Sequence, residues 1–205
     1  MKKILKILGC IFGAVLVLLA GYLIYLFASY HRIPDNQKLQ VETLQGEDSA
    51  SETSGSAQVR EDSLQTGTEY SALTYNIGFG AYTPDFSFFM DGGKSSWAKS
   101  KDSVLETVNG AGELAASYDP DFALIEEIDL DATRSYHVDE YSILKNYFPD
   151  YYYVFAKNYD SAFLLYPFTQ PHGSSKAGIG VFSRYPVTSA LRRSFPVSTS
   201  FTKFF

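Results

Sequence analysis

Pro120-Asp-Phe-Ala-Leu-Ile-Glu-Glu-Ile-Asp129 is the stretch that decides how this chain folds. Its continuous apolar run predicts a buried strand, covered on both faces, with acidic side chains at its end. A second stretch of the same character lies upstream, at Leu73-Thr-Tyr-Asn-Ile-Gly78, and ends in an amide. Carboxylate and amide oxygens are ligands for hard cations such as Mg²⁺. The sequence therefore predicts two buried strands that each deliver a metal-binding oxygen.

Helix and strand patterns alternate around these two stretches. The first predicted helix has Ser103 and Glu106 as a possible capping box, while Gly110 and Gly112 lower its helix propensity. The predicted elements are helices at 101–118 and 138–148, and strands at 70–77, 121–128, 151–156, 178–184 and 188–195. Helices placed between strands favour a layered α/β domain over an all-β one.

Polar side chains at the two strand ends are the candidate ligands. If the second strand stays extended, alternation places Glu127, Asp129 and Asp131 on one face, where their charge would attract a cation. An acidic loop that closes a buried strand explains the same pattern. Asn76 is equally well explained as a turn-forming residue before Gly78. The residues alone leave these alternatives open.

In this order the two stretches resemble the first two motifs of the endonuclease/exonuclease/phosphatase family of metal-dependent phosphodiesterases and phosphatases. A third stretch, Lys176-Ala-Gly-Ile-Gly-Val-Phe-Ser-Arg-Tyr-Pro-Val187, is similar to that family's glycine-rich strand. The resemblance implies an α/β (α+β) fold, a four-layered sandwich of two mixed β-sheets flanked by helices, incomplete here and preceded by one transmembrane helix. It also implies attack of water on a phosphate ester.

The resemblance gives roles to two residues. Glu127 occupies the position of the family's metal-binding Glu, and Asn76 matches an Asn that orients metal and phosphate, so both are candidate catalytic and metal-binding residues. Glu126 stands where the family often has Gln, and Gly78 stands where some members have an acid. The implied cofactor is Mg²⁺ or Mn²⁺, and the implied substrate is a phosphate ester of a nucleic acid, a phospholipid, or an inositol or sugar phosphate. No protein partner is implied.

The remaining motifs of the family are expected further along the chain. Its Asp-x-Asn motif and its terminal Asp-His pair should lie beyond Phe205, so we expect the N-terminal part of a longer hydrolase that is inactive alone. Two alternatives stay open. One is a noncatalytic extracytoplasmic binding protein on the same fold, and the other is a membrane-anchored structural protein in which Asn76 and Glu127 are simply polar strand ends.

Other arginines, histidines and aromatic residues have mainly structural interpretations. Guanidinium groups match phosphate geometry, but exposed arginines on strand faces are the commoner case. Aromatic runs at 151–153 and 163–168 could stack bases or grip lipid, although packing explains most aromatic residues. The arginines concerned are Arg134, Arg184, Arg192 and Arg193. The three histidines, none of which lies in the family's catalytic His motif, are His31, His137 and His172.

The N-terminal segment predicts a membrane anchor. Residues 7–28 are apolar over a length sufficient to cross a hydrocarbon core of about 30 Å. Lys2, Lys3 and Lys6 precede this run, so the positive-inside rule places residues 1–6 in the cytoplasm and the rest of the chain outside the cell membrane. A cleaved signal peptide is the alternative, but its apolar region is usually shorter.

Composition divides the rest of the chain into a linker and one domain. Residues 29–69 are polar and acidic and are predicted to be a disordered tether, whereas residues 70–205 form the globular part. The net charge of −6 argues against a nonspecific nucleic-acid binder. Cys10 is the only cysteine, so no disulfide can form within the chain.

Overall fold

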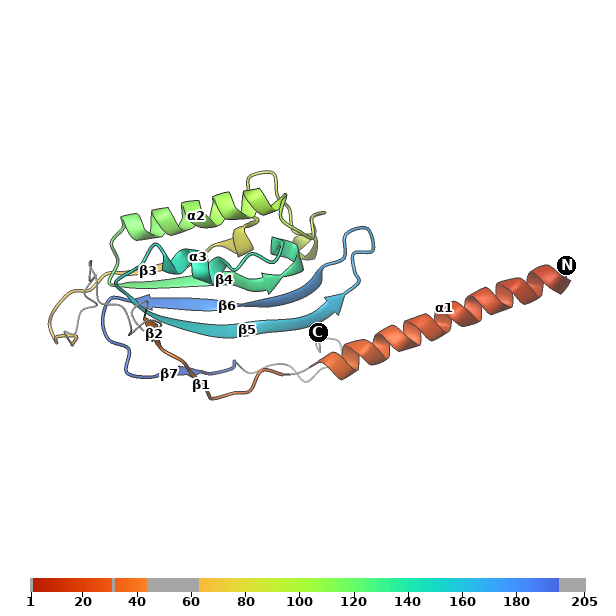
Figure 1. Ribbon diagram of the computed structural model, residues 1–205, viewed down its shortest axis with the longest axis horizontal. Helices are drawn as coiled ribbons and strands as arrows, with labels where there is room; N and C mark the ends of the chain where they lie inside the picture. Colours follow the sequence, from red (N-terminus) through yellow and green to blue (C-terminus); the bar gives the residue numbers. More distant parts are fainter. Residues whose placement is uncertain (1, 31, 44–62, 196–205) are drawn as a thin grey trace, which may run out of the picture.

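The structure is a computed structural model that describes residues 2–30, 32–43 and 63–195. It shows a mixed α/β arrangement with two sheets and a long N-terminal helix that extends away from them (Figure 1). This helix, α1 (Lys2–Ser29), is apolar along its length and has no buried residue. Its length and position fit either a membrane span or a signal sequence.

The main sheet has five strands in the order β2-β5-β6-β4-β3. Its strands are β2 (Glu42–Thr43), β3 (Ala72–Asn76), β4 (Phe122–Ala132), β5 (Tyr152–Leu164) and β6 (Gly173–Ser183). β3 and β4 are parallel, with Asn76 opposite Glu126, whereas β6 runs antiparallel to both β4 and β5. The strands β3, β4 and β5 therefore point the same way, and their carboxyl ends lie at one end of the sheet.

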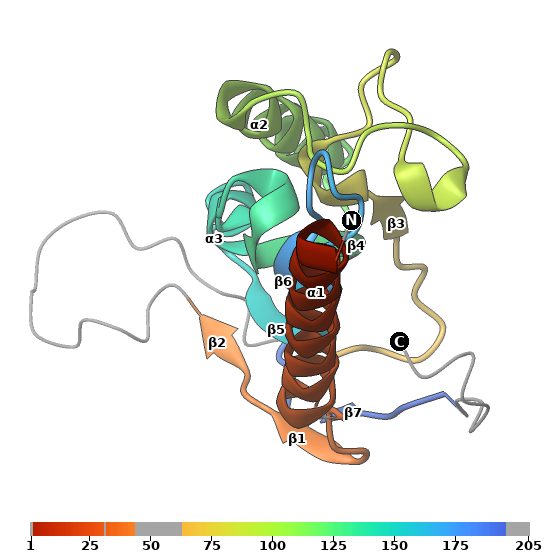
Figure 2. The ribbon, with the colours of Figure 1, turned by 90° about the vertical axis from the view of Figure 1, so that its right-hand side faces the viewer.

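Helices cover one face of this sheet, as Figures 1 and 2 show. α2 buries the face that its 3.6-residue periodicity predicted, including Val104, Val108 and Ala115. These side chains belong to the same core as Ile125 and Phe182 of the sheet. The elements between strands are α2 (Lys101–Ser117), α3 (Glu140–Lys145) and the 3₁₀ turns η2 (Gly78–Gly80), η3 (Phe89–Asp91) and η4 (Thr133–Ser135).

Several predicted boundaries are corrected by the structure. Ser100, not Ser103, caps α2, because the Ser100 side chain accepts a hydrogen bond from the Ser103 backbone N–H at 3.1 Å. α3 is shorter than the predicted 138–148, since Asp139 caps its start. β4 and β5 continue beyond their predicted ends at 128 and 156, through irregular positions where the pairing register shifts. Alternation is lost at such bulges, so the sequence pattern ends before the strand does.

A second, small sheet lies on the side of the main sheet away from α2 (Figures 1 and 2). It consists of β1 (Gln37–Leu39) and β7 (Ala190–Arg192), which pair in antiparallel fashion. β1 and β2 both fall in the segment predicted to be a disordered tether, so residues 37–43 differ from that prediction. β2 pairs with the edge of β5, and the Glu42 carboxylate lies 3.1 Å from Lys145 Nζ. Residues 44–62 lie outside the described residues.

Candidate functional site

A bulge in β4 sets the geometry of the candidate site. The pairing of β4 with β6 shifts between Ile125 and Ile128, and Glu127 within this bulge has a φ of 56°. A positive φ is uncommon for any residue other than glycine, and bulges re-aim side chains. Glu126 and Glu127 are consequently both exposed, although strict alternation would place them on opposite faces.

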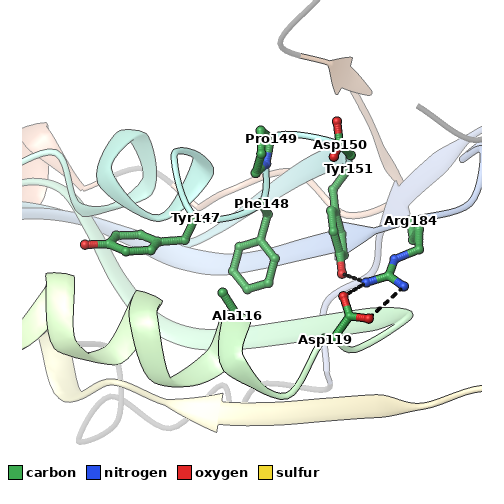
Figure 3. A pocket seen from close by; sticks show the side chains of 8 residues that line it. All are labelled: Ala116, Asp119, Tyr147, Phe148, Pro149, Asp150, Tyr151 and Arg184. Atoms are coloured by element: carbon green, nitrogen blue, oxygen red, sulfur yellow. Dashed lines mark hydrogen bonds and ion pairs between the residues drawn. The ribbon is translucent and has the colours of Figure 1, made fainter. Parts of the chain in front are cut away.

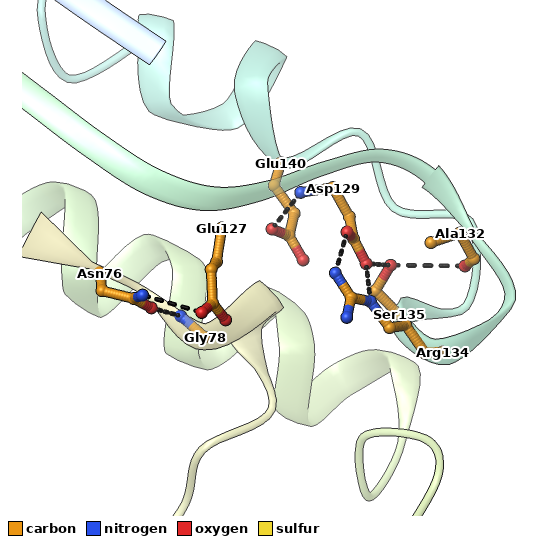
Figure 4. A network of polar contacts seen from close by, with 8 residues as sticks. All are labelled: Asn76, Gly78, Glu127, Asp129, Ala132, Arg134, Ser135 and Glu140. Carbon is orange, nitrogen blue, oxygen red and sulfur yellow. Dashed lines mark hydrogen bonds and ion pairs between the residues drawn. The ribbon is translucent and has the colours of Figure 1, made fainter. Parts of the chain in front are cut away.

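The bulge brings Glu127 to the end of β3. Figure 4 shows the side chains of Asn76 and Glu127 pointing toward one another, and Asn76 Nδ2 donates a hydrogen bond to Glu127 Oε1 at 2.8 Å. Asn76 Oδ1 accepts a hydrogen bond from the Gly78 backbone N–H at 2.9 Å, which fixes the orientation of the amide. Asn76 therefore stabilises the turn, as its structural interpretation predicts, and also contacts Glu127, while its role toward metal and phosphate stays a prediction.

The position of Gly78 leaves no room for an acid. Its φ is 55°, and a Cβ atom there would come within 2.4 Å of Tyr82 Cδ2. The Tyr82 hydroxyl in turn donates to Asp91 Oδ2 at 2.9 Å. Burial, together with the negative charges of Asp91 and Glu127, raises the pKa of Tyr82 to about 12. Tyr82 is thus a protonated hydroxyl close to Glu127.

Asp129 and Asp131 do not share a face with Glu127, contrary to the prediction from strand alternation. Asp129 is fully buried, and the Ser135 hydroxyl donates to it at 2.8 Å. Asp131 is exposed, and His137 Nδ1 lies 2.5 Å from its Oδ1. The bulge between Ile125 and Ile128 breaks the two-residue period before Asp129, and a second register shift between Asp129 and Asp131 breaks it again.

Close to Glu127, the side chains of Asp129, Arg134 and Glu140 form a buried network of charges. Arg134 donates from Nε and Nη2 to the two oxygens of Asp129 at 3.0 and 2.8 Å, and its guanidinium carbon lies 3.8 Å from the centre of the Phe79 ring. Figure 4 shows this pair beside Glu140, whose Oε2 accepts from the Asp129 backbone N–H at 2.9 Å. Arg134 is therefore neither a solvated surface arginine nor an exposed phosphate ligand.

Glu140 is a buried acid that the sequence analysis missed. Burial, and then the nearby charge of Asp129, raises the pKa of Glu140 well above its usual range. Its Oε1 has no hydrogen-bond partner among the described residues. Acidic residues in the first turn of a helix are ordinarily exposed and interact with the helix dipole, so its position gave no signal of burial.

The arrangement at Asn76 and Glu127 fits part of a divalent-cation site. Magnesium typically takes one or two carboxylates, keeps several waters and uses oxygens of a substrate phosphate. Glu127 supplies an exposed carboxylate, which Asn76 Nδ2 holds, while Asn76 Oδ1 accepts from the Gly78 backbone N–H. Within the described part of the chain, no group of three or more His, Cys, Asp and Glu side chains is placed to hold a metal ion. The two residues therefore fit a water-rich site with one protein carboxylate.

The histidines do not join this site. His172 is buried against the Phe88 and Phe89 rings, and burial, followed by the charge of Arg134, lowers its pKa to about 4. His137 contacts Asp131 on the surface. His31 lies outside the described residues. A neutral, buried His172 agrees with the structural interpretation of this residue.

The other arginines lie elsewhere. Arg184 forms an ion pair with Asp119 and donates to the Tyr151 hydroxyl at 2.8 Å, in a recess of about 410 Å³ (Figure 3). This recess lies where β4 begins and β6 ends, far along the sheet from Asn76. Arg192 donates to the backbone oxygens of Lys157 and Pro34. The structure thus brings Asn76 and Glu127 together and leaves Arg184 and Arg192 apart from them.

Comparison with known proteins gives one match. Residues 73–200 match the profile described as the Endonuclease/Exonuclease/phosphatase family, a range that contains both Asn76 and Glu127. Searches of curated proteins and of solved structures found no match.

Proposed function

Because this chain belongs to the endonuclease/exonuclease/phosphatase family, we propose that it is a membrane-tethered, metal-dependent phosphoric-ester hydrolase. In this proposal Asn76 and Glu127 form part of the active site. The observation that carries it is the hydrogen bond of 2.8 Å between Asn76 Nδ2 and Glu127 Oε1, since it joins the end of β3 to the bulge of β4, two places far apart in sequence. The strained backbone at Glu127 supports the same assignment, because such strain concentrates at functional sites.

The two residues have different roles in this proposal. The Glu127 carboxylate binds Mg²⁺ or Mn²⁺, and Asn76 holds that carboxylate in place through its Nδ2 group. Asn76 can also donate to a phosphate oxygen without adding charge to the site. When bound, the divalent cation would stabilise negative charge on the phosphoryl oxygens during attack by water. The buried pair of Asp129 and Arg134 supports the strand segment that carries Glu127.

The proposal extends to the architecture and location of the chain. Residues 70–205 form a sandwich-type domain of this family; α2 and α3 cover one face of its main sheet, and the small sheet of β1 and β7 lies on the other side (Figure 1). Residues 7–28 span the cell membrane, residues 1–6 are cytoplasmic, and residues 29–69 link the anchor to an extracytoplasmic domain. The substrate is a phosphate ester, implied by the family alone, and comes from nucleic acid, phospholipid, or inositol or sugar phosphate.

A noncatalytic binding protein on the same fold is the second candidate. One observation favours it: the described residues contain no group of three acidic, histidine or cysteine side chains that could hold a metal. This candidate predicts a folded domain whose stability does not respond to divalent cations.

Metal-dependent stability tests the proposal. Unfolding of the chain in detergent is followed with and without Mg²⁺ or Mn²⁺, for wild type, Glu127→Gln and the matched control Glu126→Gln. Both variants remove one charge, and glutamine preserves the acceptor for Asn76. A cation at a hundredfold excess over its Kd stabilises the folded state by about 2.7 kcal/mol. We expect this stabilisation in wild type and Glu126→Gln and its loss in Glu127→Gln; equal stabilisation of all three proteins would refute the assignment.

Hydrolysis is tested on the protein purified from its native membrane. The expected result is cleavage of an activated phosphodiester that stops when the divalent cation is chelated and resumes when it is restored. Metal-dependent stabilisation at Glu127 without hydrolysis would refute the hydrolase activity and leave only the metal site.

A further inference from the structure

The loop between β5 and β6, taken together with the last two residues of β5, is apolar and exposed. Residues 163–172 read Phe-Leu-Leu-Tyr-Pro-Phe-Thr-Gln-Pro-His, without an Asp, Glu, Lys or Arg. Tyr166 and Phe168 are 64% and 82% exposed. Met90, 67% exposed, follows Phe89, whose ring centre lies 5.9 Å from that of Tyr166. An exposed patch of large apolar side chains marks an interaction surface.

This loop is joined to α1. The Leu165 backbone N–H donates to the Tyr22 hydroxyl at 2.9 Å, and the Phe163 backbone N–H donates to the Tyr25 hydroxyl at 3.1 Å. Figure 1 shows α1 leaving the domain at the end where the β5–β6 loop projects. The apolar loop therefore lies beside the C-terminal turns of the long apolar helix.

The length of α1 indicates how deep in the bilayer this contact lies. Nineteen residues separate Lys6 from Tyr25, which corresponds to about 28 Å along a helix. The hydrocarbon core of a bilayer is about 30 Å thick. With Lys6 at the inner boundary, Tyr25 reaches the outer one, where tyrosines are enriched. The loop backbone bonded to Tyr22 and Tyr25 then lies at the same depth.

We propose that the loop at residues 163–168, together with Met90, is a membrane-contacting surface that inserts into the outer headgroup layer beside α1. The inference rests on one part of the proposed function, namely that α1 spans the membrane. Because the loop has no charged side chain, apolar insertion supplies the contact and attraction to anionic lipid does not. Since β3 and β5 end on the same side of the sheet, insertion turns the end that carries Asn76 toward the lipid surface.

Probes on two exposed side chains test this inference. In a Cys10→Ser background, the full chain carries a single cysteine at Phe168→Cys or at the control Tyr118→Cys, labelled with an environment-sensitive fluorophore. Tyr118 is 67% exposed and lies after α2, at the opposite end of the sheet. Each protein is reconstituted into phosphatidylcholine vesicles with or without lipids that carry a quencher near the headgroup.

At position 168 we expect a blue-shifted emission, and we expect lipids with a headgroup quencher to quench it. At position 118 we expect neither the blue shift nor the quenching. Addition of phosphatidylglycerol or salt should leave the quenching at 168 unchanged. Equal, unquenched emission at both positions in chains that stay with the vesicles overturns the inference and leaves the proposed function intact. A blue shift at 168 without quenching, accompanied by energy transfer between labelled chains, overturns it in favour of contact with a second copy. Chains that do not stay with the vesicles would show that α1 does not span the membrane, and this result would also overturn the inference.

Discussion

At the scale of single residues, the left-handed backbone of Glu127 in the β4 bulge brings its carboxylate to the end of β3 and so forms the candidate site. The bulge interrupts the regular alternation of side chains after Ile125. The Glu127 carboxylate therefore reaches Asn76 on the neighbouring strand. A non-glycine residue in this conformation costs on the order of 1 kcal/mol or more. Family resemblance alone selected both residues in the sequence, and their catalytic and metal-binding roles stay predictions. Their contact through a bulge could not be predicted, because alternation assumes an unbroken strand.

The buried histidine gives a pH dependence with a definite sign. His172 has a pKa of about 4 in the folded chain, below its ordinary value of 6.5, because it is buried and then because Arg134 lies near. Between these values the unfolded state binds more protons, so stability is full above pH 6.5 and falls as the pH falls toward 4. At pH 5 the loss is about 2 kcal/mol relative to pH 7.5.

Urea unfolding at pH 7.5 and pH 5 checks this prediction. His172→Phe, which keeps an aromatic ring against Phe88 and Phe89, should lose most of the difference between the two pH values. His137→Asn is the control, since His137 is exposed and asparagine tolerates its φ of 57°. If His172→Phe retains the full difference while His137→Asn loses it, His172 is not the group that titrates.

At the scale of elements, regular segments followed the sequence and irregular ones did not. α2 appears where its apolar period predicted, because the face with Val104 and Val108 is continuous over several turns. α3 is short and depends on the Asp139 cap and on contact with the sheet, so its pattern overestimated its length. The strand β2 is only two residues long and pairs with β5 more than a hundred residues away. A strand this short, paired with a distant segment, shows no periodic pattern in the sequence, so it could not be predicted.

Two glycines in α2 should respond in opposite ways to alanine. A Cβ at Gly110 would have no heavy atom within 4 Å, whereas a Cβ at Gly112 would lie 2.4 Å from Tyr147 Cδ2. Gly110→Ala should therefore stabilise the chain by about 0.5–1 kcal/mol through helix propensity. Gly112→Ala should destabilise it by about 1–3 kcal/mol, because the Tyr147 ring must move.

Denaturant unfolding of the two variants measures this difference directly. The Tyr147 hydroxyl donates to Asn109 Oδ1 at 2.7 Å, which restrains the ring that Gly112 faces. Stabilisation by both substitutions would mean that Tyr147 does not pack on α2 as described.

At the scale of the whole molecule, strand direction gathers the functional features at one end. β3, β4 and β5 run the same way, so Asn76, the loop before α2 and the exposed β5–β6 loop share one end of the sheet. The recess at Arg184 lies at the other end. From the sequence, the long apolar N-terminal helix and the buried strands could each be predicted, but strand order could not, because it depends on pairings between distant segments. In the proposal that α1 spans a membrane, α1 also sets the orientation of this end of the sheet.

The lysines in the first turns of α1 should set that orientation. Lys2, Lys3 and Lys6 are the basic residues on the N-terminal side, so the positive-inside rule keeps this side in the cytoplasm and the sheet outside. A membrane-impermeant maleimide added to intact cells should label Tyr118→Cys in a Cys10→Ser background. Replacing the three lysines with glutamine leaves flanking basic residues only on the far side, and labelling should fall as chains insert in the opposite direction. Labelled chains that appear in the medium with reduced mass would instead identify α1 as a cleaved signal. Unchanged labelling of membrane-bound chains after the lysine substitutions would show that another feature fixes the orientation.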